Sequence, residues 1–193
     1  MVLLAAGSGS RFGADKRRHV IAGTPLLITT AQRYASVFAH VSVVLRPREE
    51  DLAQALREAL PHQQLEVTYA GDAHLGMGHS LAAGVSACSH WPWLFVALAD
   101  MPFVRTQTLN LLRDQFPRAD IVIPTFAGRD GHPVGFAQRF FTALTELSGD
   151  AGARRVIEAN RDRVTRVETE DAGVIRDVDR PSDVDSNEEL PRD

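Results

Sequence analysis

The chain has 193 residues and a mass of 21.1 kDa, which suits one domain with a substantial core better than two. Hydrophobic residues make up 44% and charged residues 24%, which excludes a disordered chain, a collagen-like fibre and a coiled coil. The formal net charge of -4 argues against binding to nucleic acid through bulk electrostatics.

The single cysteine, Cys88, excludes an intramolecular disulfide framework and fits a reducing compartment. No apolar run approaches the length of a membrane span, and no basic region precedes the apolar start of the chain. We therefore expect a cytoplasmic protein with no membrane partner. We also expect one domain over residues 1–183 and a polar tail over 184–193.

In the first half of the chain, short apolar runs alternate with segments of helical spacing. Thr24 and Pro25 fit the N-cap and first position of a helix. The run WLFVAL shows no alternation, which is typical of a central parallel strand buried on both faces. Strands are predicted at 1–6, 40–46, 65–70 and 93–98, and helices at 25–37, 48–60 and 80–87.

In the second half, an apolar–turn–apolar pattern over 126–136 predicts a hairpin with its turn at 128–131. Helices are predicted at 106–116, 139–148 and 151–160, and strands at 120–124, 164–168 and 174–178. The alternation of strands and helices with short loops predicts a doubly wound α/β sheet with right-handed crossovers. Ligands bind such sheets beyond the carboxyl ends of the strands.

A glycine-rich segment, GSGSRFGADK, follows the first predicted strand over residues 7–16. Its glycines fit neither the GxGxxG dinucleotide fingerprint nor a Walker A loop. The segment can still wrap a polyphosphate with backbone amides, Arg11 and Lys16, although two solvated cations on a surface loop are an equal alternative. Lys16 is the only lysine beside 20 arginines. A compact ammonium can approach a phosphate oxygen where a guanidinium is too broad.

Aspartates end two of the predicted strands. Asp100 directly follows the central apolar strand, so it should face the same crevice as the glycine-rich segment and could bind Mg²⁺ there. The alternative is an ordinary turn or helix-cap aspartate. Asp177 and Asp179 alternate along the last predicted strand and could meet one metal together. The alternative is that both are exposed carboxylates that pair with the neighbouring arginines.

Two further segments contain polar or glycine-rich patterns. Residues 71–80 include GMGHS, whose glycines and helix start could line a base or phosphate pocket. The histidines of this segment lack a third soft ligand nearby, which argues against zinc. His132 beside Pro133 is more typical of a structural than of a catalytic histidine, and Cys88 fits core packing.

Several motifs together resemble the nucleotidyltransferases built from a single doubly wound domain. The motifs are LAAGSGSRFGADK, GMGHSLAAGV, LADMP, GRDGHPVGF, GDAGAR and DVDRP, between residues 3 and about 183. Within that class they resemble the molybdenum cofactor cytidylyltransferases. The chain departs from the resemblance at 17–19, where RRH replaces apolar residues, and at 180–183, where RPSD replaces a more acidic stretch. The resemblance implies a mostly parallel, Rossmann-like sheet with a small β-hairpin insertion.

The resemblance also implies roles for individual residues. Lys16, Arg11 and Asp100 would be the catalytic set, with Arg11 and Lys16 on the triphosphate. Asp100, with Asp177 or Asp179, would bind Mg²⁺. The nucleotide site would include Leu4, Ala5, Ala6, Gly7, Ser8, Gly9, Gly71, Met77, Gly78 and Ser80. The acceptor site would include His132, Pro133, Gly149, Asp150 and Gly152.

The expected reaction is transfer of CMP from CTP to a phosphomonoester such as molybdopterin, with release of pyrophosphate. A molybdoenzyme or its maturation factor is the expected partner. Three alternatives remain open at this point: guanylyl transfer from GTP, a sugar- or alcohol-phosphate acceptor, and a nucleotide-binding module without catalysis.

Overall fold

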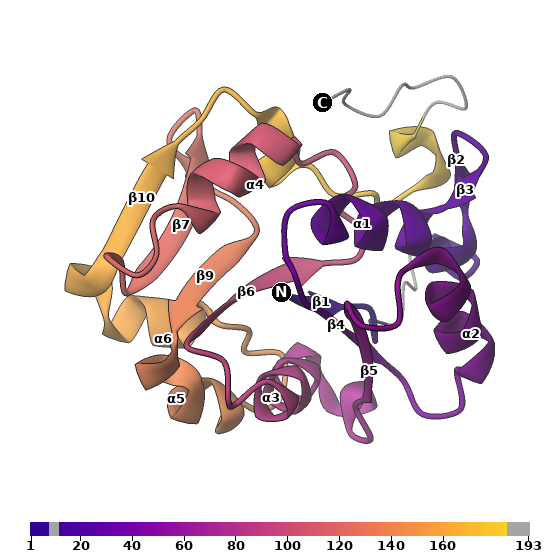
Figure 1. Ribbon diagram of the computed structural model, residues 1–193, viewed down its shortest axis with the longest axis horizontal. Helices are drawn as coiled ribbons and strands as arrows, with labels where there is room; N and C mark the ends of the chain where they lie inside the picture. The colour runs from indigo at the N-terminus through magenta and orange to yellow at the C-terminus, as the bar shows by residue number, and fades with distance from the viewer. Residues whose placement is uncertain (8–11, 185–193) are drawn as a thin grey trace.

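The computed structural model describes residues 1–7 and 12–184. Its centre is an eight-stranded sheet in the order β10-β7-β9-β6-β1-β4-β5, with β8 paired to β7 (Figure 1). The strands are β1 (Val2–Leu4), β4 (Val41–Leu45), β5 (Leu65–Tyr69), β6 (Trp93–Leu98), β7 (Ile121–Phe126), β8 (Arg129–Asp130), β9 (Val134–Ala137) and β10 (Val164–Glu168). A separate hairpin joins β2 (Val20–Ile21) to β3 (Thr24–Pro25).

Helices cover both faces of the sheet (Figure 1). The α-helices are α1 (Leu26–Ala35), α2 (Glu50–Ala59), α3 (Met77–Ala87), α4 (Thr106–Arg113), α5 (Phe141–Thr145) and α6 (Arg154–Ala159). The 3₁₀ turns are η1 (Lys16–Arg18), η2 (Ala73–Leu75), η3 (Gln138–Phe140), η4 (Arg161–Arg163), η5 (Ala172–Ile175) and η6 (Pro181–Asp183). Among the described residues, no helix is both long and apolar enough to cross a membrane.

The alternation of side chains along β1 shows how the two layers form. Leu3 packs into one apolar cluster with α1, α2 and α4, whereas Val2 and Leu4 pack into the opposite cluster with α3, α5 and α6. Both faces of the central strands are therefore dry, as their continuous apolar sequences require. The prediction of one doubly wound, mostly parallel α/β domain is confirmed.

Strand β9 is the main departure from a fully parallel sheet. The pairs β1–β4, β4–β5, β1–β6 and β7–β10 are parallel, but β9 runs antiparallel to both β6 and β7. The predicted hairpin exists as β7–β8, but its turn lies at Ala127–Gly128, where both residues have positive φ. The turn predicted at 128–131 was therefore misplaced, because Arg129 and Asp130 already belong to the return strand.

Four other local predictions need correction. The strand predicted at 174–178 is wrong, because η5 and an irregular segment occupy this stretch. Thr24 does not cap α1, since it pairs in the β2–β3 hairpin and Pro25 precedes the helix. Helix α3 begins at Met77 rather than at residue 80. Val184, assigned to the tail, is buried in a third apolar cluster, so the domain includes it.

Asp171 anchors the segment between β10 and η5 against the start of α4. It is 3% exposed. Its carboxylate accepts hydrogen bonds from the amide of Arg105 at 2.7 Å, the hydroxyl of Thr108 at 2.7 Å and the amide of Gly173 at 2.9 Å. A buried charge with three donors holds the irregular segment in a fixed position, which in turn positions residues 177–179.

We expect Asp171→Ala to lower the free energy of unfolding by roughly 3 kcal/mol, because two buried amides and a hydroxyl lose their acceptor. Urea denaturation followed by circular dichroism measures this loss. Asp162→Ala is the matched control, since the Asp162 side chain is 80% exposed and its removal should change stability by less than about 0.5 kcal/mol. Equal losses in the two variants would contradict the anchoring role.

Candidate active site

Three adjoining cavities lie at the carboxyl ends of the central strands. The glycine-segment cavity has a volume of about 500 Å³ and is lined by Gly7, Ser80, Asp100 and Asp150, among others. The large cavity has a volume of about 690 Å³, and Leu4, Met77 and Leu98 line both. A small cavity of about 50 Å³ between Gly7, Lys16 and Asp100 lies beside them. This is the edge at which doubly wound sheets bind ligands.

Lys16 connects three segments at this edge. Its Nζ donates to Asp100 Oδ2 at 2.5 Å, to the carbonyl oxygen of Val178 at 3.2 Å and to Asp179 Oδ1 at 3.3 Å. The glycine-rich segment and the end of β6 therefore face one crevice, as predicted from the order of the strands. Asp100 Oδ2 and Asp179 Oδ1 are therefore close to each other, because both contact the same Nζ atom of Lys16. Asp177, the other candidate, is exposed.

The electrostatics of this cluster favour an added cation. Burial alone would lower the pKa of the Lys16 ammonium, but the hydrogen bonds and charges of Asp100 and Asp179 raise it above its ordinary value. Lys16 is therefore charged at neutral pH, and one ammonium faces two carboxylates. Asp100 Oδ1 is buried and has no hydrogen-bond partner among the described residues.

The same groups suit a hard divalent cation. Carboxylate oxygens are preferred ligands of Mg²⁺ and Mn²⁺, and the partnerless oxygen of Asp100 is available for one. Within residues 1–7 and 12–184, no group of three or more His, Cys, Asp and Glu could hold a metal. A cation at Asp100 and Asp179 would therefore take its other ligands from water or phosphate, as Mg²⁺ commonly does.

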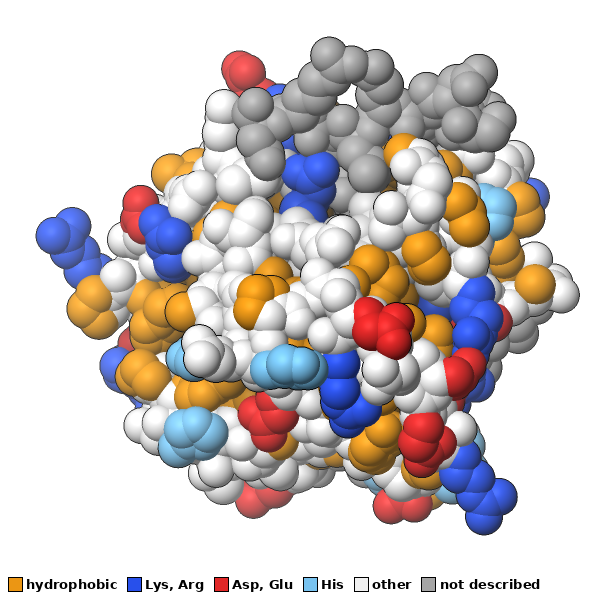
Figure 2. Space-filling model, turned by 45° about the vertical axis from the view of Figure 1, so that its right-hand side comes forward, with side chains coloured by type: hydrophobic (Ala, Val, Ile, Leu, Met, Phe, Trp, Pro, Cys, Tyr) orange, Lys and Arg blue, Asp and Glu red, His pale blue; other side chains and the backbone are white. Residues whose placement is uncertain are grey.

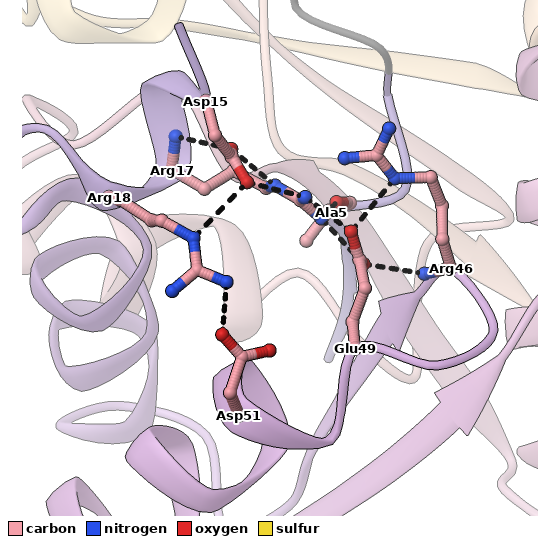
Figure 3. Close-up of polar contacts among 7 residues, drawn as sticks. All are labelled: Ala5, Asp15, Arg17, Arg18, Arg46, Glu49 and Asp51. Atoms are coloured by element: carbon pink, nitrogen blue, oxygen red, sulfur yellow. Dashed lines mark hydrogen bonds and ion pairs between the residues drawn. The ribbon is translucent and has the colours of Figure 1, made fainter.

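The partners of Arg17 show how a charged residue is accommodated at a buried position where an apolar residue was expected. It is 4% exposed, and Figure 3 shows its guanidinium between Asp15, Glu49 and Ala5. It donates to the carbonyl oxygen of Ala5 at 2.7 Å, to Glu49 Oε2 at 2.7 Å and to Asp15 Oδ1 at 2.8 Å. Glu49 also accepts from the Nε of Arg46 at 2.9 Å. This Arg17 cluster, formed by Asp15, Arg17, Arg46 and Glu49, connects the residues on both sides of Lys16 to the end of β1 and to the residue before α2.

Two glycine motifs contact each other across the cavities. Gly76 has a φ of +126°, and a Cβ there would lie 2.3 Å from the carbonyl carbon of Gly149. The amide of Gly78 donates to the carbonyl oxygen of Gly149 at 2.8 Å. Only glycine permits this approach. The contact places Met77 and Asp150 at the rim of the glycine-segment cavity.

His132 lines the large cavity. Its amide donates to the carbonyl oxygen of Val174 at 2.7 Å, and Pro133 is buried beside it. Burial lowers the pKa of the His132 imidazole below its ordinary value, which favours the neutral ring. Its Nδ1 is buried and without a hydrogen-bond partner in the described part of the chain.

The structure brings most of the candidate residues together. Those that line one or more of the three cavities are Leu4, Ala5, Ala6, Gly7, Lys16, Met77, Ser80, Asp100, His132, Asp150 and Gly152. Ser8, Gly9 and Arg11 lie outside the described residues. Gly71 is exposed in the turn before η2. Arg17 and Glu49 were not predicted as site residues, and no role was predicted for the arginines of the large cavity.

The fold and this site define a class. A doubly wound sheet with glycine-lined cavities, a lysine and two aspartates at its carboxyl edge is the arrangement of a single-domain nucleotidyltransferase. Residues 1–164 match the family described as the MobA-like NTP transferase domain, and the chain belongs to this family.

The chain is also similar to individual proteins outside this description of the family. The chain is 29% identical over 191 residues to the purine catabolism protein PucB of Bacillus subtilis, covering 95% of this chain and 93% of PucB. It is 33% identical over 133 residues to the bifunctional protein GlmU of Roseobacter denitrificans, covering 67% of this chain but only 29% of GlmU. Rv0371c of Mycobacterium tuberculosis, solved as a complex with manganese, is 26% identical with a TM-score of 0.76, covering 94% of this chain and 93% of that one.

Charged side chains of both signs are visible on one face of the molecule (Figure 2). On the face shown in Figure 2, acidic and basic side chains among the described residues are interspersed rather than gathered by sign.

Proposed function

We propose that the protein transfers a cytidylyl group from CTP to a phosphomonoester acceptor such as molybdopterin and releases pyrophosphate. The observation that carries the proposal is the contact of Lys16 with Asp100 and Asp179 beside the glycine-segment cavity. Membership of the NTP transferase family supports the reaction class. In this proposal residues 1–184 form the catalytic domain in the cytoplasm, and the product passes to a molybdoenzyme or its maturation factor.

The nucleotide would occupy the glycine-segment cavity. Backbone groups of residues 4–7 would hold the base, with Met77, Gly78 and Ser80 beside the nucleotide. Lys16 and Arg11 would bind the triphosphate, which carries roughly four negative charges. Asp100 and Asp179 would hold Mg²⁺, which when bound neutralises phosphate charge and orients the oxygens in line. The manganese complex of Rv0371c supports a divalent cation in this class.

The chemistry needs no strong general base. A phosphomonoester is already ionised at neutral pH, so its oxygen attacks the α-phosphorus of CTP directly. The bond from that phosphorus to the bridging oxygen breaks, and the electron pair leaves with pyrophosphate. The ammonium of Lys16 neutralises charge on the departing phosphates, and the Arg17 cluster holds the segment that carries it. Catalysis then rests on positioning and charge neutralisation.

We expect a steep preference for CTP over the purine nucleotides. A base read by backbone hydrogen bonds leaves buried groups unpaired when the wrong base binds, which costs several kcal/mol. Pyrophosphate release with CTP, UTP, GTP and ATP, each with and without a molybdopterin-containing extract, measures both the base preference and the need for an acceptor.

The controls separate the parts of this proposal. Heat-treated enzyme in the same extract gives the background release. Comparable kcat/KM for CTP and GTP would contradict the cytidylyl assignment and the placement of the base. No enzyme-dependent pyrophosphate release with any of the four nucleotides, under any acceptor condition, would contradict nucleotidyl transfer itself.

A further inference from the structure

Arg46 lines the glycine-segment cavity and takes no part in the group transfer itself. It directly follows β4 and is half-buried. Among the described residues that line this cavity, it is the only lysine or arginine. In the sheet order β6-β1-β4, Asp100 and Arg46 follow strands two positions apart, which corresponds to about 10 Å along the sheet edge. The cavity therefore has an aspartate on one side and an arginine on the other.

Lys16 and Arg46 lie in different parts of the site. In the described part of the chain, Lys16 lines the small cavity but not the glycine-segment cavity, and the reverse holds for Arg46. Asp100 lines both cavities and so connects them. A nucleotide whose triphosphate lies at Lys16 and Asp100 would therefore have its base in the part of the cavity that contains Arg46.

Glu49 holds the guanidinium of Arg46 in one orientation. The Nε of Arg46 donates to Glu49 Oε1 at 2.9 Å, and the backbone amide of Arg46 donates to Oε2 of the same carboxylate at 2.9 Å. The buried Arg17 also donates to Glu49 Oε2, at 2.7 Å, and so holds the carboxylate in place. The orientation of the Arg46 guanidinium is therefore set before a ligand binds, which lowers the entropy that binding costs.

The two terminal nitrogens of Arg46, Nη1 and Nη2, are available to a ligand. Neither makes a hydrogen bond or an ion pair with residues 1–7 or 12–184. Figure 3 shows both on the side of the guanidinium away from Glu49. They form a rigid, planar pair of N–H donors on a side chain that has no acceptor. Such a pair fits two neighbouring acceptor atoms of a planar molecule and is repelled by a donor at either position.

The edges of the two pyrimidine bases differ in this respect. Cytosine presents two neighbouring acceptors, N3 and O2. In uracil, N3 carries a hydrogen and is a donor, so only O2 can accept from the guanidinium. CTP and UTP have the same ribose and triphosphate and nearly the same size, so this edge is the main difference that a fixed arginine can detect. A site built around hydrogen bonds rejects a ligand that leaves its polar groups unpaired.

We propose that Arg46 selects cytosine over uracil, with Nη1 and Nη2 donating to N3 and O2 of the base. This inference rests on the proposed function, because CTP is the nucleotide of that reaction. It adds a side chain that reads the base and a nucleotide, UTP, that this side chain rejects. The backbone groups of residues 4–7 account only for the preference over the purine nucleotides.

Calorimetric titration of CTP and UTP into the full chain, with Mg²⁺ and without an acceptor, tests this by binding rather than by turnover. We expect the wild-type chain to bind CTP at least tenfold more tightly than UTP. Arg46→Lys conserves the charge but removes the planar pair of donors, and it should bring the two affinities within about threefold, mainly by weakening CTP binding. Arg46→Gln should do the same, because an amide offers one donor and one acceptor and can pair with either base.

Arg48→Lys is the matched control. Arg48 follows the same strand, is exposed and, among the described residues, lines none of the three cavities. Its replacement should leave the ratio of the two affinities within about twofold of the wild-type ratio. A thermal melt of each variant shows that it is folded, which we expect for Arg46→Lys because a lysine can also pair with Glu49.

The outcomes separate this inference from the proposed function. Equal binding of CTP and UTP by the wild-type chain, or an unchanged ratio in the two Arg46 variants, would overturn the inference even if CTP-dependent pyrophosphate release is observed. A parallel loss of affinity for both nucleotides would assign Arg46 to the triphosphate and overturn it as well. A tenfold preference that is lost in both Arg46 variants and kept in Arg48→Lys would support it even if no acceptor yields pyrophosphate. No binding of either nucleotide by the wild-type chain would overturn the inference together with the proposed nucleotide site.

Discussion

Asp100→Asn is expected to lower kcat by at least a hundredfold while the protein remains folded. The carboxylate stands at the end of β6, where one oxygen accepts from Lys16 at 2.5 Å and the other is buried without a partner in the described part of the chain. An amide cannot supply the negative charge that a divalent cation requires. Loss of charge stabilisation in a site of this kind typically costs 10²–10³ in rate, or about 3–4 kcal/mol.

Steady-state pyrophosphate release at saturating CTP and Mg²⁺, together with a thermal melt, measures both parts of this expectation. Asp114→Asn is the matched control, because the Asp114 side chain is 65% exposed and pairs only with its neighbour Arg113 among the described residues. It should keep wild-type kcat. A kcat for Asp100→Asn within threefold of wild type would show that this carboxylate takes no part in the reaction.

Lys16→Arg is expected to lower kcat about a hundredfold although it conserves the charge. The ammonium fits among three oxygens, from Asp100, Val178 and Asp179, at 2.5 to 3.3 Å, and its side chain is only 16% exposed. A planar guanidinium is too broad for this space and would displace either the carboxylates or the phosphate. Loss of one positioned cation costs on the order of 3 kcal/mol in the transition state, which is about a hundredfold in rate.

The neighbouring substitution Arg18→Lys serves as the control. Arg18 lies in the same 3₁₀ turn, its side chain is 51% exposed, and it forms ion pairs with Asp51 and, at 3.5 Å, with Asp15, which a lysine can also make. We expect this variant to keep most of its activity, measured with the same kinetic assay and a thermal melt. Near-wild-type kcat in Lys16→Arg would mean that the reaction does not require an ammonium at this position. The presence of the only lysine here would then not reflect a role in catalysis.

The meeting of Lys16 and Asp100 was predictable because it depends on sheet topology. Both residues follow parallel strands, whose carboxyl ends share one edge, and the apolar sequence of residues 93–98 identifies the central strand. The composition singled out Lys16 independently. The local sequence pattern and the sheet topology were therefore sufficient to predict that Lys16 and Asp100 face the same crevice.

The choice between Asp177 and Asp179 was not predictable in this way. A short strand was predicted over residues 174–178, with Asp177 and Asp179 on one face, but Asp171 caps a 3₁₀ turn there through the amide of Gly173. The carboxylates therefore do not share a strand face, and Asp179 reaches Lys16 while Asp177 is exposed. A buried aspartate with long-range donors overrides a local pattern.

The Arg17 cluster and the contact between Gly76 and Gly149 could not be predicted from local sequence patterns either. Arg17 is buried only because Glu49, 32 positions away, and the carbonyl oxygen of Ala5 satisfy its donors. Gly76 and Gly149 approach each other across more than 70 positions of sequence. Such contacts depend on the complete fold, whereas sequence spacing reports only on near neighbours.

A crystal structure of the protein with CTP, or a non-hydrolysable analogue, and Mn²⁺ located by its anomalous signal tests the proposed site most directly. We expect one manganese peak bound by carboxylate oxygens of Asp100 and Asp179, the triphosphate beside Lys16, and the base near residues 4–7. A manganese peak away from Asp100, or a nucleotide bound outside the glycine-segment cavity, would contradict the proposed metal and nucleotide sites.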